Sequence, residues 1–410
     1  MPVPNHLPLP APAAPPTRTP KGLVGLLACA SGLSVANVYY AQPLLDQMAG
    51  DFAISTAAVG GVITATQVGS VLALLLIVPL GDQLNRRYLM LAQIGALIAA
   101  LFCLGMTHSA TIMLLAMFAV GLLGTAMTQG LIAFAATAAA PQERGRVVGA
   151  VQGGVVIGLL LSRLAAGVIC DLAGWRWVYL GSALVMAMLA LILCKVLPAQ
   201  RPSTAPMAYP QLVWSMFRLL KEDRVLQIRG MLALFVFAVL GIFWSALVFL
   251  LSQAPHEFSH TTIGFFGLVG VAGALAASRA GIQADKGLAQ RTTGLALGLL
   301  IVAWVALWLT PWSLLWLVLG IVILDLGAQA VHVTNQSMIF SARSDSHSRA
   351  VGCYMLFYAI GSGLGALAST AVHAAYGWTG VCVLGAGVSV AALGFWAVTV
   401  RQTPAMALPA

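Results

Sequence analysis

Two charged residues stand inside long apolar stretches of the sequence. Arg163 lies in "GLLLSRLAAGVI" (158–169), and Asp325 lies in "ILDLGAQAVHVTNQSMIF" (323–340). A charge at the centre of a membrane costs about 2.5–3.5 kcal/mol, so such residues usually face the interior of a helical bundle and mark a pathway. A carboxylate there can take up and release a proton, and a guanidinium can bind an anion.

Asp325 begins a polar stripe. Gln329, His332 and Gln336 follow it at four, seven and eleven positions, so all four share one face of a helix, with Asn335 beside them. This predicts a helix face that lines a cavity, with His332 as a further proton or ligand group. Other apolar stretches contain further polar and aromatic side chains, namely Asn37, Tyr40, Gln67, Thr128, Gln129, Trp244 and Tyr358.

Such a cavity would have aromatic walls with amide and hydroxyl contacts, which suits an amphipathic organic molecule. For each single polar residue the alternative is a hydrogen bond to a neighbouring helix. No nucleotide-binding loop, metal-ligand cluster or catalytic constellation occurs in the sequence, so we expect no enzyme activity, no metal and no cofactor.

The elements that position these residues follow from composition. Of 410 residues, 60% are hydrophobic and 8% are charged, which indicates a membrane protein. Runs of about 20 apolar residues predict spanning helices. The sequence predicts an all-α polytopic membrane protein with twelve of them, at 22–45, 57–80, 88–107, 110–136, 147–170, 177–197, 230–252, 262–280, 292–310, 314–340, 349–372 and 379–400.

The positive charges predict the orientation. Eighteen of the 20 Lys and Arg residues fall in the loops on one side, which by the positive-inside rule is cytoplasmic, together with both termini. The net charge of +9 therefore reflects topology and contact with membrane lipids, and it does not indicate nucleic-acid binding. Residues 1–20 are rich in proline and predict a disordered cytoplasmic tail.

The sequence also contains an internal repeat. Three pairs of residues are each 203 positions apart, namely Asp82 and Asp285, Arg146 and Arg349, and Trp175 and Trp378. One constant offset predicts a duplicated unit of six helices in parallel orientation. We therefore expect six-helix halves at 21–197 and 230–400, a cytoplasmic linker with an interfacial helix at 198–229, and a cytoplasmic tail at 401–410.

Two motifs resemble a known family. "VPLGDQLNRR" (78–87) resembles the loop motif G-x-L-A-D-R-x-G-R-R of the major facilitator superfamily, with Asp82, Arg86 and Arg87 at matching positions. "NVYYAQPLLDQMAGDF" (37–52) is similar to the first-helix motif of its 12-helix drug:proton antiporter branch, in a subgroup of bacterial exporters with N-V-Y-Y-x-Q-P-L-L. The resemblance implies the major facilitator fold, the bacterial inner membrane, and conformational latch loops at Asp82, Arg86, Arg87 and Asp285. It also implies a central cavity lined by spans 1, 4, 7 and 10, to which the polar and aromatic side chains named above would contribute.

One departure concerns span 5. Antiporters of that branch have a Gly-Pro pair where this chain has Ser162 and Arg163, which weakens the inference of antiport. Spans 5 and 10 are neighbours in the family fold, so the resemblance implies that Arg163 and Asp325 could form an ion pair between the halves. One alternative is a static structural pair. The other is that Arg163 binds a carboxylate of the substrate.

The resulting functional hypotheses are three. The first is a monomeric, proton-driven exporter of small organic or drug-like molecules, with Asp325 as proton carrier. The second is a proton-coupled importer of an organic anion, with Arg163 as anion site. The third is a non-transporting sensor or a lipid-moving protein on the same scaffold. The expected partners are a small-molecule substrate, protons and membrane lipids.

Overall fold

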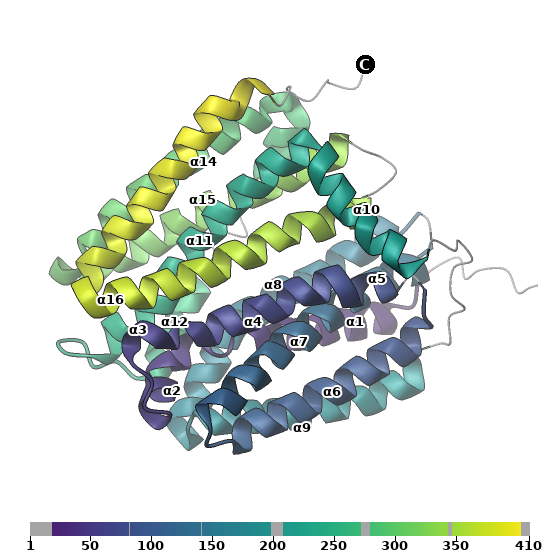
Figure 1. The fold of residues 1–410 in the computed structure, drawn as a ribbon, viewed down its shortest axis with the longest axis horizontal. Coiled ribbons are helices and arrows are strands. Elements are labelled where there is room, and N and C mark those ends of the chain that lie inside the picture. Colours follow the sequence, from purple (N-terminus) through teal and green to yellow (C-terminus); the bar gives the residue numbers. More distant parts are fainter. Residues whose placement is uncertain are drawn as a thin grey trace, which may run out of the picture.

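A computed structural model describes residues 19–81, 83–140, 142–197, 208–271, 279–342 and 347–402. The elements in these ranges are helices (Figure 1). Ten helices of the described part are long and apolar enough to cross a membrane. The predicted all-helical polytopic fold is therefore confirmed.

The first half contains nine α-helices and two short irregular ones. They are α1 (Lys21–Tyr39), η1 (Gln42–Leu44), α2 (Leu45–Asp51), α3 (Thr56–Val59), α4 (Gly61–Leu72), η2 (Ala73–Ile77), α5 (Val78–Leu80), α6 (Arg86–Met106), α7 (Ala110–Ala138), α8 (Arg144–Ala173) and α9 (Trp175–Val196). The amphipathic α10 (Tyr209–Glu222) follows at the junction, as expected for an interfacial helix.

The second half is described in the same way. It comprises α11 (Arg224–Ser252), α12 (His260–Val269), η3 (Ala284–Leu288), α14 (Ala289–Trp308), η4 (Thr310–Trp312), α15 (Leu314–Ala342), α16 (His347–Thr399) and η5 (Val400–Gln402). Helix α16 covers two predicted spans, 349–372 and 379–400. The chain changes direction between them at Gly377, where φ is +61°. The predicted span 262–280 falls on α12 and on residues outside the described ranges.

The two halves repeat the same packing. In the first half α1 packs on α8, α4 on α7 and α6 on α9. Their counterparts in the second half pack alike, since α11 lies on α16, α12 on α15 and α14 on α16. A duplicated six-helix unit would produce this arrangement.

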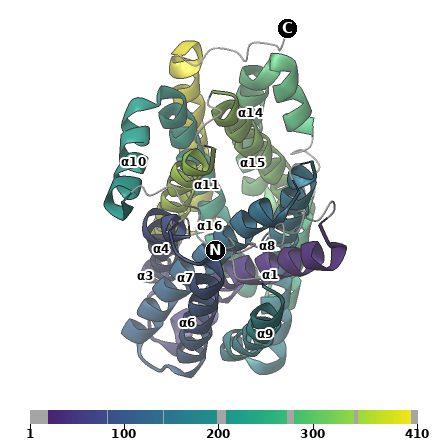
Figure 2. The same cartoon turned by 90° about the vertical axis from the view of Figure 1, so that its right-hand side faces the viewer.

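The halves contact each other mainly through two pairs of helices. Helix α8 packs on α12, and α4 packs on α16, and these pairs are counterparts under the repeat. Figure 2 shows the second half above the first, with α8 and α16 near the boundary. The residues around these contacts are therefore the ones that two moving halves would share.

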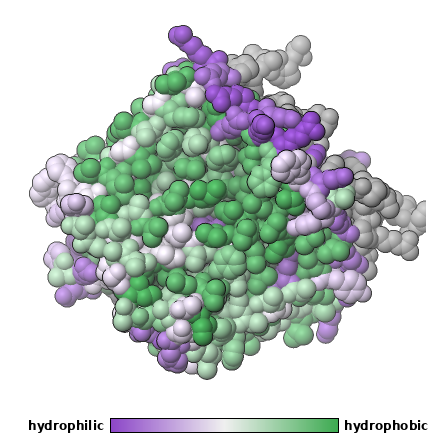
Figure 3. Space-filling view, viewed as in Figure 1, coloured by the Kyte–Doolittle hydropathy of each residue, from purple (hydrophilic) through white to green (hydrophobic). Residues whose placement is uncertain are grey.

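The outer surface is apolar over a broad area. Figure 3 shows hydrophobic residues across the face of the bundle and hydrophilic ones gathered toward α10. Leu172 and Leu315 are 81% and 78% exposed, and many other large apolar side chains of the long helices are exposed as well. Such a surface is suited to a bilayer and would favour aggregation in water.

Candidate functional site

Helix α1 is interrupted near the boundary between the halves. It ends at Tyr39, and the chain continues as η1, whose Pro43 has no N–H to extend the helical hydrogen bonding. The short turn places Gln42, buried at 4% exposure, against α8. This break therefore delivers an amide side chain to the neighbourhood of Arg163.

Arg163 of α8 lies in a buried polar and aromatic setting. Its Nε donates a hydrogen bond to Oε1 of Gln42 at 3.0 Å. Its guanidinium carbon lies 3.9 Å from the ring centroid of Trp244 in α11, and 5.9 Å from that of Tyr39. A desolvated cation–π contact is worth about 2 kcal/mol, so Trp244 offsets part of the cost of burying the charge.

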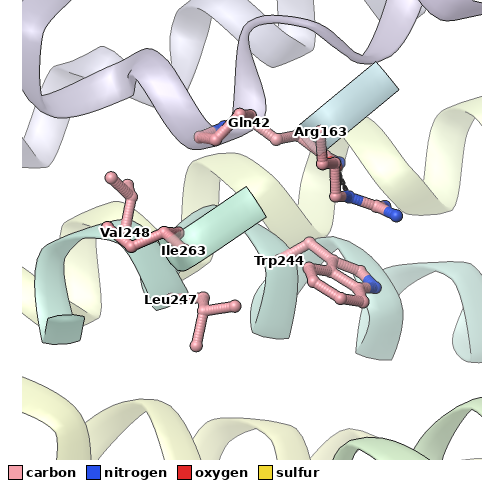
Figure 4. A pocket seen from close by; sticks show the side chains of 7 residues that line it. Gln42, Arg163, Trp244, Leu247, Val248 and Ile263 are labelled. Atoms are coloured by element: carbon pink, nitrogen blue, oxygen red, sulfur yellow. Dashed lines mark hydrogen bonds between the residues drawn. The ribbon is translucent and has the colours of Figure 1, made fainter. Parts of the chain in front are cut away.

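A small pocket lies beside this arginine (Figure 4). Both halves contribute to its lining, which consists of Gln42, Pro43, Arg163, Trp244, Leu247, Val248 and Ile263. The guanidinium extends over Trp244, whereas the aliphatic side chains lie on the other side of the view. The pocket thus places one cation and one amide beside apolar walls, at the boundary between the halves.

Glycines of α12 make room for Arg163. A Cβ on Gly264 would lie 2.6 Å from the carbonyl oxygen of Arg163, and a Cβ on Gly267 would lie 3.1 Å from its Cβ and Cδ. A larger residue at either position would push the two helices apart. The close backbone contact between α8 and α12 therefore positions Arg163 between the halves.

Asp325 of α15 lies against the end of α12, where Gly270 follows Gly264 and Gly267. It is 8% exposed, and its Oδ2 is 2.5 Å from the place where a Cβ on Gly270 would lie. No nitrogen of Arg163 comes within 4 Å of its carboxylate, although both residues are described. The direct ion pair is therefore not formed in this conformation, because α12 packs between α8 and α15 and takes the place expected for span 10.

A second contact between the halves involves two tyrosines. The hydroxyl groups of Tyr39 and Tyr358 are hydrogen-bonded to each other. The ring of Tyr358 packs on Phe237 with centroids 3.8 Å apart. Phe237 also meets the ring of His332, whose Nδ1 lies 2.9 Å from the Tyr354 hydroxyl. The predicted residues Tyr358 and His332 thus belong to one aromatic group with Tyr39.

Several predicted cavity residues bond inside one half. Asn37 accepts a hydrogen bond from Ser182 at 2.6 Å and donates to the Leu33 carbonyl. Thr128 donates to the Gly124 carbonyl of its own helix. Tyr40 packs edge-on against Tyr179. These three residues therefore have partners within the first half, and their predicted place in the cavity stays a prediction.

Four predicted amides have different positions. Gln67 is buried where α4 meets α16, next to Gly363. Gln129, Gln329 and Gln336 are half-buried, and the contacts described for the chain include no hydrogen bond from them. Gln329 and Gln336 share the α15 face of Asp325 by their spacing, so the polar stripe remains a prediction.

Arg229 is a buried cation that the sequence interpretation assigned to the linker. Helix α11 begins at Arg224, and Arg229 is fully buried in it. Its Nη1 donates to Thr293 Oγ1 at 3.1 Å and to Asn335 Oδ1 at 3.4 Å. Arg163 is therefore not the only buried cation among the described residues, and Asn335 is a partner of Arg229, while its predicted place in the cavity stays a prediction.

The predicted latch loops are described in part. Arg86 donates from Nε to the Gly81 carbonyl at 2.9 Å and from Nη1 to the Ala133 carbonyl at 3.1 Å. Arg87 donates to the Cys194 carbonyl at 2.7 Å. Both arginines thus join ends of helices within the first half. Asp82 and the side chain of Asp285 lie outside the described residues.

One more polar group joins the halves, at the end of the molecule opposite α10, which we expect to face the periplasm. His260, the first residue of α12, lies between Asp46 of α2 and Asp171 of α8. We call these three residues the periplasmic cluster. The sequence did not single out these three residues, because they are far apart in the chain.

Two similarly packed helical halves with buried charges at their boundary are the architecture of a membrane transporter. A sequence model of the Major Facilitator Superfamily matches residues 27–347, and the chain belongs to this family. The family consists of transporters and not of enzymes.

Similar proteins agree with this assignment. The chain is 39% identical to the "Uncharacterized transporter YgaY" of Escherichia coli O157:H7 over 381 residues, which cover 91% of this chain and 94% of the relative. Among solved structures it is similar to a bacterial homolog of the human lysosomal transporter Spinster in an inward-facing, occupied conformation, with a TM-score of 0.76, 17% identity and coverage of 93% and 96%. The human organic anion transporter MFSD10 has a TM-score of 0.66 at 17% identity, with coverage of 92% and 100%.

Proposed function

We propose that the protein is a proton-coupled exporter of small organic molecules that works by alternating access. It acts as a monomer in the bacterial inner membrane with both termini in the cytoplasm. The observation that carries the proposal is the buried carboxylate of Asp325 on α15, held against α12 where α12 meets α8 of the other half. A carboxylate in this place can change its protonation as the halves move, and the change alters the charge balance around Arg163.

The export proposal is tested in inside-out membrane vesicles with an acidic lumen, with ethidium as the transported probe. We expect ethidium to accumulate, an uncoupler to abolish the accumulation, and Asp325→Asn to lower the initial rate at least tenfold. Glu222→Gln is the matched control, because it makes the same chemical change on the exposed surface of α10. Ethidium accumulation that survives the uncoupler or Asp325→Asn would contradict the proposal.

A second candidate is import of an organic anion with a proton. It is favoured by the state of Arg163, whose Nη atoms have no hydrogen-bond partner among the described residues while its Nε is held by Gln42. The planar fork of a guanidinium binds a carboxylate through two parallel hydrogen bonds. In this candidate Arg163 binds the anion, and Asp325 takes up the accompanying proton.

The test for import uses right-side-out vesicles in acidic medium and labelled benzoate. Benzoate uptake that is lost in Arg163→Gln and kept in Arg218→Gln, an exposed arginine of α10, would support import. Ethidium export without benzoate uptake would leave the first proposal as the function.

A further inference from the structure

The periplasmic cluster has a geometry that depends on a proton. Nε2 of His260 lies 3.0 Å and 3.1 Å from the two carboxylate oxygens of Asp46. Nδ1 of the same ring lies 3.3 Å from Oδ1 of Asp171. The three side chains are 11%, 19% and 26% exposed, so the ring is largely shielded while its partners reach the surface.

Only one form of the histidine satisfies both neighbours. Ionised carboxylates accept hydrogen bonds and donate none, whereas a neutral imidazole has one N–H and one lone pair. A neutral His260 would therefore direct its lone pair at one of the two aspartates. The imidazolium form donates from both nitrogens, so the observed arrangement is complete when His260 is protonated.

The two aspartates differ in how they are held. Asp171 also accepts hydrogen bonds from the backbone N–H groups of His260 at 3.1 Å and Thr261 at 2.8 Å, which begin α12. These bonds do not depend on the protonation of the ring. Asp46 contacts α12 only through Nε2 among the bonds described, so it is the partner that is most sensitive to the proton.

The cluster lies where the halves are in direct contact. Gly167 of α8 packs on the carbonyl of His260, and a Cβ at this glycine would collide with it. Opening of this end requires α8 and α12 to separate, which breaks the contacts of His260 with Asp46 and Asp171. The protonated cluster therefore opposes opening more strongly than the neutral one.

Other charged groups near α12 are few. Helix α8 adds Arg163, two turns from Asp171, and α15 adds Asp325 at the other end of α12. Helix α11 contributes the uncharged Leu247 and Val248 near the start of α12. The preceding loop contributes Glu257, which is exposed, and His256, whose ring packs on Phe258. Asp46 and Asp171 are thus the charges in contact with the His260 ring.

We propose that His260, Asp46 and Asp171 form a proton-binding site that keeps the periplasmic end of the transporter closed while His260 is protonated. The site is distinct from Asp325, because it lies at the end of α12 remote from that residue. It binds its proton from the periplasm when the end is open, and closure follows.

The electrostatics agree with this assignment. His260 precedes the predicted span 262–280. Burial lowers its pKa, but the hydrogen bond to Asp46 and the charges of Asp46 and Asp171 outweigh burial, so the pKa in the closed form is raised above 6.5. The closed form thus gains stability below about pH 6.5 and loses it as the pH rises through the raised pKa.

The inference deepens the proposed function, on which its place in the transport cycle rests. An exporter driven by protons must return from its outward-open to its inward-open form after it has taken a proton from outside. A site that closes the outer end upon protonation promotes that step. The pH dependence of closure itself requires neither a substrate nor a gradient.

The experiment measures the distance between the two halves at the periplasmic end. Spin labels are attached at Ala173→Cys, at the end of α8, and at Gln253→Cys, before α12; both positions are exposed and lie on opposite halves of a full-length chain whose six native cysteines are replaced. Pulsed electron paramagnetic resonance in lipid nanodiscs then gives the closed and open populations between about pH 5 and pH 9. The ratio of open to closed should rise with pH, by at most tenfold per pH unit for one proton.

The variants separate this site from other causes. His260→Gln should remove the pH dependence, and Asp46→Asn should move its midpoint down toward pH 6.5. His256→Gln is the matched control at the same end, and it should behave like the unsubstituted chain. A pH-independent ratio in the unsubstituted chain, or an unchanged pH dependence in His260→Gln, would overturn the inference.

The two proposals fail separately. Loss of ethidium export with pH-dependent closure intact counts against the proposed function alone. Proton-driven export with pH-independent closure counts against the periplasmic site alone.

Discussion

The guanidinium carbon of Arg163 lies 3.9 Å from the ring centroid of Trp244, and this contact joins α8 of one half to α11 of the other. Together with the Gln42 hydrogen bond, it holds a cation that is 5% exposed and has no carboxylate of a described residue within 4 Å. The charge is stabilised by a π-face and an amide, which leaves one edge of the guanidinium available. Changes to these neighbours should therefore have measurable effects.

Replacement of Trp244 should test the cation–π contact. We expect Trp244→Leu to lower the free energy of unfolding by about 2 kcal/mol or more, since a cation–π contact and buried area are lost together. Trp244→Phe should lose less, because an aromatic face remains. Thermal unfolding of the purified protein measures both variants. Trp214→Leu on the exposed face of α10 is the control, and equal losses for Leu and Phe at position 244 would argue against the π contact.

Exchange of the two buried charges should not restore the protein. Arg163→Asp and Asp325→Arg should each lose stability and transport, and their combination should lose both as well. The reason is steric, because the Asp325 carboxylate already lies against Gly270 and leaves no room for a longer side chain. Ethidium transport and thermal unfolding are the measurements. Recovery in the double variant would show that the two residues pair directly in another conformation.

Substitution of Gly264 should separate α8 from α12. A methyl group there would meet the carbonyl oxygen of Arg163 and Cα of Leu164, at 2.6 and 2.8 Å. We expect Gly264→Ala to lower the free energy of unfolding by about 1–3 kcal/mol through overpacking. Gly298→Ala in α14 is the matched control, since nothing lies within 4 Å of its added methyl group. A neutral effect at Gly264 would mean that the helices can move apart freely.

The contribution of His260 to stability should depend on pH. Its pKa is raised in the closed form, because the contacts with Asp46 and Asp171 outweigh the effect of burial. The stabilisation is therefore complete below about pH 6.5 and disappears as the pH rises through the raised pKa. The difference in thermal midpoint between the unsubstituted chain and His260→Gln should be large near pH 5.5 and small near pH 9. A difference that grows with pH would reverse this assignment.

The general architecture could be predicted from the sequence because the bilayer constrains it strongly. Long apolar runs specify helices, and the 203-residue offset between Trp175 and Trp378 is visible without coordinates. The start of α11 could not be placed, because Arg224 and Arg229 are typical of a loop by composition. Arg229 is buried through hydrogen bonds to Thr293 and Asn335, which only the folded bundle brings together.

The site was predicted in part for a similar reason. Arg163 and Asp325 were recognisable because charge is rare in apolar helices. Their neighbours could not be recognised, because the hydrogen-bond partner of an amide depends on how its helix is rotated about its axis. Asn37, for example, is hydrogen-bonded to Ser182 within its own half. His260, Asp46 and Asp171 belong to three separate elements, and no spacing in the sequence connects them.

The two contacts between the halves are chemically unequal. Ala366, the counterpart of Arg163 under the repeat, packs by its carbonyl against Gly60. Neutral hydrogen bonds join α16 to the first half here, from Thr64 of α4 to Gly363 and from Thr370 to Ala57 of α3. The charged groups described above, Arg163 and the periplasmic cluster, therefore act on the α8–α12 contact. When the periplasmic end opens, we expect α8 and α12 to separate more than α4 and α16.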